Sequence, residues 1–576
     1  MMNVMRFYAV PLVALSLSSI APHSRAQDFS VEDYRKALWM TARMYGGQRS
    51  GEGPNWLVMD HGSGTDFVDD ADGSHDLSGG WHDCGDHVKF GQTQYYSAYV
   101  LLKAYAEFPR GFDDFYSFDY HGYQQAGDFS WEGNAGAPNG IPDILDEVKY
   151  ATDYFITCAR DDNTFYYQVG EGALDHKNWV TSVKMATLPY DEGGQPRKAW
   201  KNPGGSSMAS FCGATLALMS RVYRRFDSDY ADLCLQHARH AYAYAAAHPG
   251  SVGAAFYPAN EKWEDDFVVL ASELYWATDE QQYLDAALDK ASSVSDHNWS
   301  LCYNNNDDLA MYNLALLGSD IQKNALENVV ERYKSNVTSD GVGTIGGDWG
   351  VLRFGANQAF AAALSAKLEN ASQVDAFIYD NIDYIMGANS RSYSFIVGFG
   401  ATHAEHPHHR NVFLNDDNVE NKNSLTIPQR NRQFGYMVGG TLDPHSYADD
   451  IGDYATSEGG IDYNAGLVAT LGYIMSKLAP VDTSKFGTVI AHRASTSGTA
   501  AEPSWTVSAV GGKTVITFSR FAVSDGALVG LFSLNGRRVA HKSVAHGRAV
   551  FGNVPCQTHI IRVRAGERSF GRMVFP

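Results

Sequence analysis

Residues 207–226 read SMASFCGATLALMSRVYRRF, and their apolar side chains recur at the spacing of one helix face. The stripe consists of Met208, Phe211, Cys212, Met219, Val222, Tyr223 and Phe226. Spacings of three and four residues predict a helix that buries one side. Comparable patterns occupy roughly 31–47, 92–107, 142–159, 229–247, 264–277, 281–294, 307–317, 321–334, 355–368, 373–387 and 462–478. From residue 31 to residue 478 the chain is therefore predicted to be all-α, with about twelve helices.

This number of consecutive helices is compatible with two arrangements, an α-solenoid and an (α/α)6 barrel, and periodicity does not choose between them. The connecting loops are long and rich in glycine and aromatic residues. Every cluster of residues that could act in catalysis or bind a ligand lies on such a loop. We therefore expect a functional site where several loops meet.

One of these loops reads GGWHDCGDH at residues 79–87 and stands just ahead of a predicted helix. It holds Asp83 and Asp86 three positions apart between glycines, so both carboxylates can point at one place. A carboxylate held in this way can activate water as a general base. The alternative is structural, because aspartate in such loops also caps helices and binds ions.

A second carboxylate-rich segment, YADDIGDYATSEGGIDYNA at residues 447–465, contains Glu458 just before another predicted helix. The helix dipole would lower the pKa of Glu458, so an acid role requires burial and neighbouring carboxylates to raise it. Asp449, Asp450 and Asp453 are the candidates for those neighbours. One activated water and one proton donor are the minimum equipment for inverting glycoside hydrolysis.

These motifs resemble those of the family 9 glycoside hydrolases, the endoglucanase family, from about residue 28 to residue 478. The family's GGWYDAGDH corresponds to GGWHDCGDH, with differences at His82 and Cys84. Its SYVVGFG followed by PHHR corresponds to YSFIVGFG at 393–400 and PHHR at 407–410. The resemblance implies the (α/α)6 barrel, with an open cleft formed by the loops at one end.

The acid segment of the family, NEVATDYNAG, corresponds to SEGGIDYNAG at residues 457–466. Gly459 and Gly460 replace a larger and a small residue there, which we expect to loosen the backbone beside the acid. Carried over residue by residue, the resemblance makes Asp86 the base, Asp83 its partner on the nucleophilic water and Glu458 the general acid.

The resemblance also implies side chains that bind sugar. His408 and Arg410 would donate to hydroxyl groups flanking the scissile bond, although the run HAEHPHHR at 403–410 could instead bind a metal. His176 and Trp179 match the family's D-x-H-x-x-W loop, in which a histidine bonds a sugar and an indole forms an apolar floor. A surface histidine beside a buried tryptophan is the alternative there, and Tyr463 either contacts the sugar or packs.

Asp265 and Asp266 follow the segment 257–264, and Asp307 lies in a comparable acidic turn. The resemblance implies a structural ion here, because similar stretches hold one in family members. Oxygen ligands of this kind suit calcium, so a structural calcium ion is one expectation, although the serine-containing version of the pattern is not present here. Hydrolysis itself requires no cofactor. Cys84, Cys158, Cys212, Cys234, Cys302 and Cys556 are scattered, which predicts neither a disulfide scaffold nor a zinc site.

The composition suits a large secreted globular enzyme, and we expect a monomer. The net charge of −21 argues against nucleic acid or anionic membranes as partners, whereas a neutral β-glucan is indifferent to it. Residues 1–26 are predicted to be a signal peptide, with Arg6, an apolar stretch at 7–20 and a small-x-small cleavage site at 24–26. A membrane anchor is the alternative, but the apolar run is too short to span a bilayer and no later segment approaches that length. We expect a secreted or surface-associated protein.

The sequence divides after residue 478. Residues 27–478 form the predicted catalytic domain, and residues 479–504, rich in Ser, Thr, Ala, Gly and Pro, a linker. Strands are predicted at 505–510, 513–518, 528–534 and 560–564, with an Asn-Gly hairpin turn at 535–536. This small β-sandwich at 505–576 has ten Lys and Arg against two Asp and Glu. It resembles the C-terminal sorting domains of gliding-type bacteria, and an accessory or carbohydrate-binding domain is the alternative.

The leading hypothesis for function is an endo-β-1,4-glucanase that inverts the anomeric centre. An exo-acting or processive cellulase and a xylan-active hydrolase are the alternatives among enzymes. A non-catalytic carbohydrate-binding surface protein is the alternative of another class. Asp86 and Glu458 are both present, which favours an enzyme over that last alternative.

Overall fold

The computed structural model describes residues 28–51, 66–114, 139–202, 205–254, 256–413, 429 and 433–486, and seven strands between residues 505 and 574. The predicted signal peptide and most of the predicted linker lie outside the described residues. Within the described part of the chain, no helix combines the length and apolar character that crossing a bilayer requires.

The predicted helices are all present. They are α1 Val31–Gly47, α3 Gly91–Glu107, α4 Asp143–Cys158, α7 Ser206–Val222, α8 Ser228–Ala247, α9 Glu264–Thr278, α10 Gln281–Lys290, α11 Asp307–Leu316, α12 Asp320–Ser335, α13 Val351–Leu368, α14 Ala376–Met386 and α16 Ile461–Leu478. Sequence periodicity did not predict the short helices α5 Gly172–Asp175, α6 Ser182–Ala186 and α15 Tyr454–Ser457, because four or five residues are too few to show a helical period.

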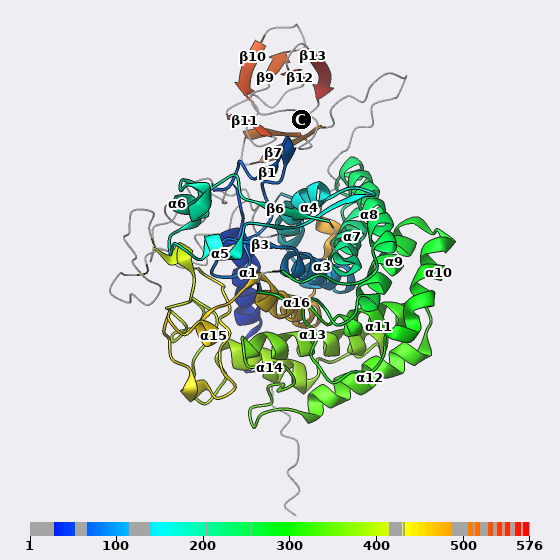
Figure 1. Cartoon of the computed structure of the whole chain (residues 1–576), viewed down its shortest axis with the longest axis vertical. Coiled ribbons are helices and arrows are strands. Elements are labelled where there is room, and N and C mark those ends of the chain that lie inside the picture. The colour runs from blue at the N-terminus through cyan, green and yellow to red at the C-terminus, as the bar shows by residue number, and fades with distance from the viewer. Residues whose placement is uncertain are drawn as a thin grey trace, which may run out of the picture.

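The contacts between helices decide the arrangement that periodicity left open. Helices α3, α7, α9, α11, α13 and α16 each pack on the next, and α16 returns to pack on α3, which closes a ring. Helices α4, α8, α10, α12, α14 and α1 pack on the outside of this ring (Figure 1). The ends of a solenoid do not meet, so the fold is the (α/α)6 barrel.

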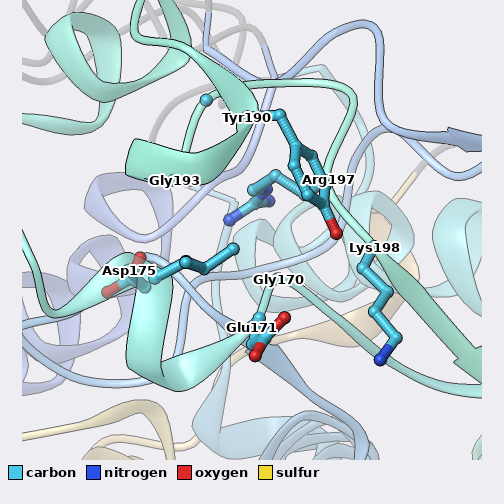
Figure 2. A pocket seen from close by; sticks show the side chains of 9 residues that line it. Gly170, Glu171, Asp175, Tyr190, Gly193, Arg197 and Lys198 are labelled. Atoms are coloured by element: carbon cyan, nitrogen blue, oxygen red, sulfur yellow. The ribbon is translucent and has the colours of Figure 1, made fainter.

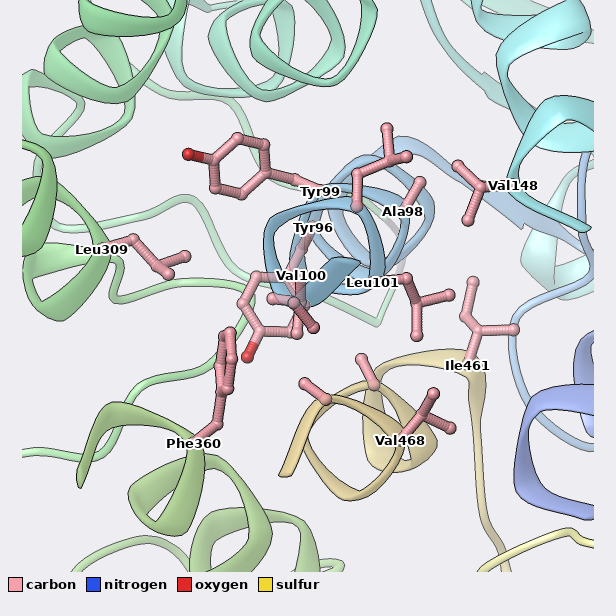
Figure 3. Close-up of a cluster of buried hydrophobic side chains, with 14 of the residues drawn as sticks. Tyr96, Ala98, Tyr99, Val100, Leu101, Val148, Leu309, Phe360, Ile461 and Val468 are labelled. Atoms are coloured by element: carbon pink, nitrogen blue, oxygen red, sulfur yellow. The ribbon is translucent and has the colours of Figure 1, made fainter. Parts of the chain in front are cut away.

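The inner helices are buried on all sides. Every residue of α16 from Ile461 to Met475 is buried, as expected for a helix that is apolar around its whole circumference. Figure 3 shows Val100 and Leu101 of α3 in the cluster that also contains Val468 of α16 and Phe360 of α13. Burying one such aliphatic or aromatic side chain stabilises the fold by roughly 1.5–3 kcal/mol, so the centre of the barrel is a rigid base for the loops above it.

Short strands fix the first loop of the site. β3 Lys89–Phe90 pairs with β5 Thr164–Val169, which also pairs with β4 Ala159–Asp161 and β6 Ala199–Lys201. A separate hairpin joins β1 Ala71–Asp72 and β2 His75–Asp76. Since β3 lies directly between the GGWHDCGDH loop and α3, the pairing of β3 with β5 sets where that loop leaves the barrel.

The C-terminal strands are β7 Trp505–Val510, β8 Lys513–Phe518, β9 Leu528–Ser533, β10 Arg538–Ser543, β11 Arg548–Gly552, β12 His559–Ala565 and β13 Arg568–Val574. They form one sheet in the order β10-β9-β12-β13 and another in the order β11-β8-β7. The four predicted strands correspond to β7, β8, β9 and β12, and the other three were not predicted. The predicted Asn-Gly turn lies outside the described residues, and the packing of a sandwich stays a prediction.

The first eight residues after α16, predicted to belong to the linker, are packed on the barrel. The Val481 amide donates to the carbonyl of Arg110, and Arg225 donates to the carbonyl of Phe486 at 3.1 Å. The ring of Phe486 is 3% exposed and belongs to the main hydrophobic core. Residues 479–486 are therefore packed on the barrel.

Candidate active site

Three loops meet at Gly85, the residue between Cys84 and Asp86. A β-carbon at Gly85 would lie 2.1 Å from the carbonyl oxygen of His408, a separation that only glycine permits. The Gly85 amide points at Glu458 Oε1, at 3.4 Å, and its carbonyl accepts from the Arg410 amide at 3.1 Å. The missing side chain thus brings the GGWHDCGDH loop, the PHHR loop and the acid segment together.

Asp83 is 2% exposed and is held by hydroxyl groups. Thr93 of α3 donates to Oδ1, and Tyr257 donates to Oδ2, which the Cys84 thiol also approaches at 3.4 Å. Burial, followed by the charge of Asp462, raises the pKa of Asp83 to about 7 against the opposing effect of these donors. The hydrogen bonds fix the orientation of the carboxylate toward the meeting point of the loops.

Asp86 is 6% exposed and lies beside another carboxylate, Asp175 at the end of α5. Burial raises the pKa of Asp86 well above its usual value, and the nearby charges of Asp175 and Asp83 add to the rise. The Arg410 guanidinium opposes it, and Arg410 donates to Asp175 Oδ2 at 2.5 Å. A cluster of this kind loses its protons in steps that belong to the group as a whole.

Glu458 is partly exposed and follows α15. Burial and then the charge of Asp83 raise the pKa of Glu458 to about 8, against the amide of Gly85 and the guanidinium of Arg410. The carboxyl group is therefore protonated at neutral pH. The neighbour that raises its pKa is Asp83, whereas the sequence analysis expected Asp449, Asp450 and Asp453; Asp449 instead accepts from His406 at 2.8 Å.

Comparisons with known proteins identify the family of the chain. The model of glycosyl hydrolase family 9 matches residues 34–471. The chain belongs to glycosyl hydrolase family 9. Endoglucanase A of Fibrobacter succinogenes is 32% identical over 70% of this chain and 92% of its own length.

Solved family structures have the same fold. An endoglucanase from the termite Nasutitermes takasagoensis is 29% identical, covers 77% of this chain and 99% of its own, and superposes with a TM-score of 0.65. The cellulase Cel9M of C. cellulolyticum, in complex with cellobiose, is 30% identical, covers 77% of this chain and 98% of its own, and has a TM-score of 0.63.

The two glycines beside the acid, which differ from the family 9 motif, do not loosen the backbone. The Gly459 amide donates to the Tyr436 hydroxyl at 3.1 Å, and that hydroxyl donates to the Gly459 carbonyl at 2.5 Å. The carbonyl of Glu458 accepts from the Gly439 amide at 2.6 Å. A β-carbon at Gly459 would lie 2.1 Å from the Met437 carbonyl oxygen. The expectation was wrong because glycine here permits close packing and is itself hydrogen-bonded.

Three of the predicted sugar-binding residues lie around this cluster. The His176 side chain is 43% exposed, with Nε2 4.0 Å from Asp86 Oδ2. The rings of Trp179 and His408 lie 4.7 Å apart, and Trp179 also packs on a small core of Val412, Phe413 and Ile451. His408 Nδ1 donates to the carbonyl of Ile451 at 2.6 Å, which leaves Nε2 as the nitrogen with the lone pair when the ring is neutral.

The other two predicted sugar-binding residues are deeper. Arg410 is 1% exposed and is fixed by the carbonyl and carboxylate of Asp175. Tyr463 is 2% exposed, with the Arg353 guanidinium 4.8 Å from its ring centre. A β-carbon at Gly350 would lie 2.4 Å from the Tyr463 hydroxyl oxygen. Packing is the role that the structure gives Tyr463, and a sugar contact from it stays a prediction.

The acidic residues predicted to hold calcium are bonded to protein donors. Asp266 accepts from Asn306 at 2.9 Å and from Ser207, and Asp265 accepts from the Asn306 amide at 3.0 Å. Lys262 Nζ lies 2.5 Å from the Asp307 carboxylate. Among the described residues, the one set of three His, Cys, Asp or Glu side chains with metal-ligand spacing is Asp86, Asp175 and His176. Lys262 thus places a positive charge where the sequence analysis expected an ion.

A small pocket adjoins Asp175. Its lining comes from residues 170–175 and 190–198, and Figure 2 shows Tyr190, Arg197 and Lys198 on one side with Asp175 on the other. Arg197 is held there by Asp70, 2.6 Å from Nη2. Asp70 also pairs with Lys89 at 3.2 Å, and the charge of Arg197 helps to lower the pKa of Asp175, so the pocket adjoins the wall that supports Asp175.

Sequence reasoning missed several residues of the site. Thr93 and Tyr257, which orient Asp83, belong to no motif considered, and Tyr257 is 174 positions away from it. Asp175 stands beside His176 in a segment that was singled out, but its bond to Arg410 joins positions 235 apart. The five cysteines in the described part of the chain are buried, and none of them forms a disulfide there.

Proposed function

We propose that this chain cleaves β-1,4-glucans internally and inverts the anomeric centre, with amorphous or soluble cellulose and mixed-linkage glucan as substrates. The observation that carries the proposal is the approach of Glu458 to the loop of Asp83 and Asp86 at Gly85, whose amide lies 3.4 Å from Glu458 Oε1, together with the mutual charge effects of the three carboxyl groups. One ionised carboxylate and one protonated carboxyl group facing a common place can activate water and protonate a leaving oxygen. The endoglucanase names of the family 9 relatives support the substrate class.

Asp86 takes the proton of the attacking water. Its Oδ1 is buried and makes no hydrogen bond to any described protein group, so it can accept one from a water molecule that enters beside it. Burial and the charges of Asp175 and Asp83 raise the pKa of Asp86, the guanidinium of Arg410 partly offsets that rise, and the carboxyl groups of the cluster lose their protons as one coupled set. Asp83, oriented by Thr93 and Tyr257, accepts a second hydrogen bond from the same water. Glu458 donates its proton to the departing sugar oxygen, because its pKa of about 8 keeps it protonated near neutral pH.

The sugar rings lie against the side chains around this cluster. His176 and His408 bond hydroxyl groups, Trp179 supplies an apolar face, and Arg410 and Tyr463 complete the wall at the cleavage point. The reaction consumes only water, so no cofactor takes part. A structural calcium ion at Asp265, Asp266 and Asp307 is a separate proposal, and a rise in melting temperature on adding calcium chloride to EDTA-treated protein would support it.

Cellooligosaccharides test the reaction directly. Proton NMR during early turnover should show the α-anomer at the new reducing end, and a first-formed β-anomer would exclude inversion. Internal cleavage should lower the viscosity of carboxymethyl-cellulose well before reducing ends accumulate. Release of a single short product from chain ends would point instead to exo or processive action, and turnover of xylan alone to another substrate class. Binding without hydrolysis would favour the non-catalytic alternative.

We also propose that the protein is exported as a monomer. The predicted signal peptide at residues 1–26 supports export, and the basic region at 505–576 is proposed to direct sorting or surface attachment. Expression with and without residues 505–576, followed by fractionation of cells and medium, tests the second point.

A further inference from the structure

The side chains of Asp86, Asp175 and His176 are of types that bind metal ions as well as types that serve glycoside hydrolysis. One ligand atom from each side chain lies within 4.8 Å of the other two. His176 Nε2 lies 4.0 Å from Asp86 Oδ2. Zinc bonds to nitrogen and oxygen are about 2.0–2.2 Å long and tetrahedral, so two ligand atoms on one ion lie about 3.4 Å apart. Side-chain movements of about 1–1.5 Å would therefore bring all three onto one ion.

Two buried carboxylate oxygens in the cluster have no partner in the described protein. Asp86 Oδ1 and Asp175 Oδ1 make no hydrogen bond there, although the two residues are only 6% and 2% exposed. Buried carboxylate oxygens are expensive to leave unsatisfied. Arg410 supplies one positive charge for two carboxylates, through its bond to Asp175 Oδ2. A cation bound between them would give both oxygens a partner.

The orientation of His176 suits a ligand. Its Nδ1 lies 2.8 Å from the Gly172 carbonyl oxygen, which can only accept, so Nδ1 carries the hydrogen. In the neutral ring the lone pair is then on Nε2, the nitrogen that lies beside Asp86. A backbone carbonyl that fixes the outer nitrogen is the usual support of a metal-bound imidazole. Because 43% of the side chain is exposed, an ion can reach it from solvent.

From this geometry we propose that Asp86, Asp175 and His176 bind one divalent transition-metal ion of the zinc or copper class. An imidazole with two carboxylates suits these ions, whereas magnesium and calcium prefer sites made of oxygen alone. The ion binds to the carboxylate that activates water and to the imidazole that faces the sugar. Its binding therefore inhibits hydrolysis reversibly and competes with substrate. The inhibition rests on the proposed function of Asp86, but the binding does not.

Calorimetric titration of zinc chloride into the full-length chain, without an affinity tag, tests the site independently of activity. We expect one bound zinc per chain, no binding of magnesium, and weaker apparent binding in the presence of cellotriose. His176→Gln, Asp86→Asn and Asp175→Asn should each weaken zinc binding by about tenfold or more, with thermal unfolding used to verify that each variant is folded. His240→Gln is the matched control, because His240 forms an imidazole–carboxylate pair with Asp162 at 2.6 Å on the protein surface.

The outcomes separate binding from function. Absence of zinc binding to the wild type, or equal affinity in the folded His176→Gln and Asp86→Asn variants, would overturn the site, as would loss of binding in His240→Gln. Zinc should inhibit carboxymethyl-cellulose hydrolysis over the concentration range in which it binds, and EDTA should restore the rate. Binding at these residues in a chain that hydrolyses no glucan would leave the site standing and remove the proposed function.

Discussion

A β-carbon on Gly460 would lie 2.7 Å from Cys84 Sγ, so the thiol fills the space that a side chain at position 460 would need. Cys84 stands where the quoted family motif has alanine, and Gly460 stands where that motif has a small side chain. The two differences therefore compensate each other in volume. The thiol also lies 3.4 Å from Asp83 Oδ2, so this packing reaches the carboxylate cluster of the candidate active site.

A double-mutant cycle tests this compensation. Gly460→Ala should destabilise the chain by about 1–3 kcal/mol, as overpacking does, and should lower activity by displacing the thiol against Asp83. Adding Cys84→Ala should restore most of both losses, because it removes the atom that clashes. Denaturant unfolding and carboxymethyl-cellulose hydrolysis of the four proteins give the coupling. Purely additive effects would mean that the contact between the two positions is not what limits residue 460.

Asp86→Asn should lower the rate of hydrolysis by about 10²–10⁴-fold, the usual contribution of a general base. The thermal stability of the same variant should rise. Because the folded pKa of Asp86 is raised, the native state holds its proton longer than the unfolded state, and stability falls as pH rises above the unfolded value. Asparagine removes that loss, so the variant should melt higher than wild type at pH 8 and equally at pH 4. A variant within tenfold of wild-type activity would exclude Asp86 as the base.

Glu458→Gln should lose activity on cellulose yet retain a large part of it on a β-cellobiosyl fluoride, because fluoride departs without a proton. In the wild type, the rate on cellooligosaccharides should fall as pH rises through about 8, where Glu458 loses its proton. That fall should be absent when the variant is assayed on the fluoride. Equal losses on both substrates would give Glu458 a structural role.

The helices were predictable because each buries a face over four or five turns, as α7 does, and the periodicity survives in the sequence. Closure of the helix ring could not be predicted from periodicity, because it depends on a contact between α16 and α3, which are far apart in the sequence. The family resemblance implied that closure in advance. At the site, Asp83 and Asp86 were recognisable from their own loop. Tyr257, which orients Asp83, and Asp175, whose charge raises the pKa of Asp86, reach them only through the fold.

Asp175→Asn should move the acidic limb of the pH profile of kcat/KM to lower pH. The charge of Asp175 raises the pKa of Asp86, and that charge also neutralises Arg410, so its removal lowers the pKa of Asp86 by both routes. The base is then ionised at lower pH. Asp296→Asn, which breaks a surface pair with Arg332, is the control and should leave the profile in place. An unmoved limb in Asp175→Asn would show that Asp175 does not tune the base.

The end of the catalytic domain can be located by two truncations. A chain ending at Leu478 lacks the buried ring of Phe486 and the ion pair of Lys485 with Asp113. Losing a buried phenylalanine costs roughly 1.5–3 kcal/mol, so this chain should melt several degrees below one that ends at Phe486. The longer truncation keeps those contacts and should match the full-length protein in melting temperature and in carboxymethyl-cellulose hydrolysis. If it is inactive or insoluble, the strands at 505–574 are part of the catalytic fold; if both truncations melt alike, the packing of residues 479–486 contributes nothing to stability.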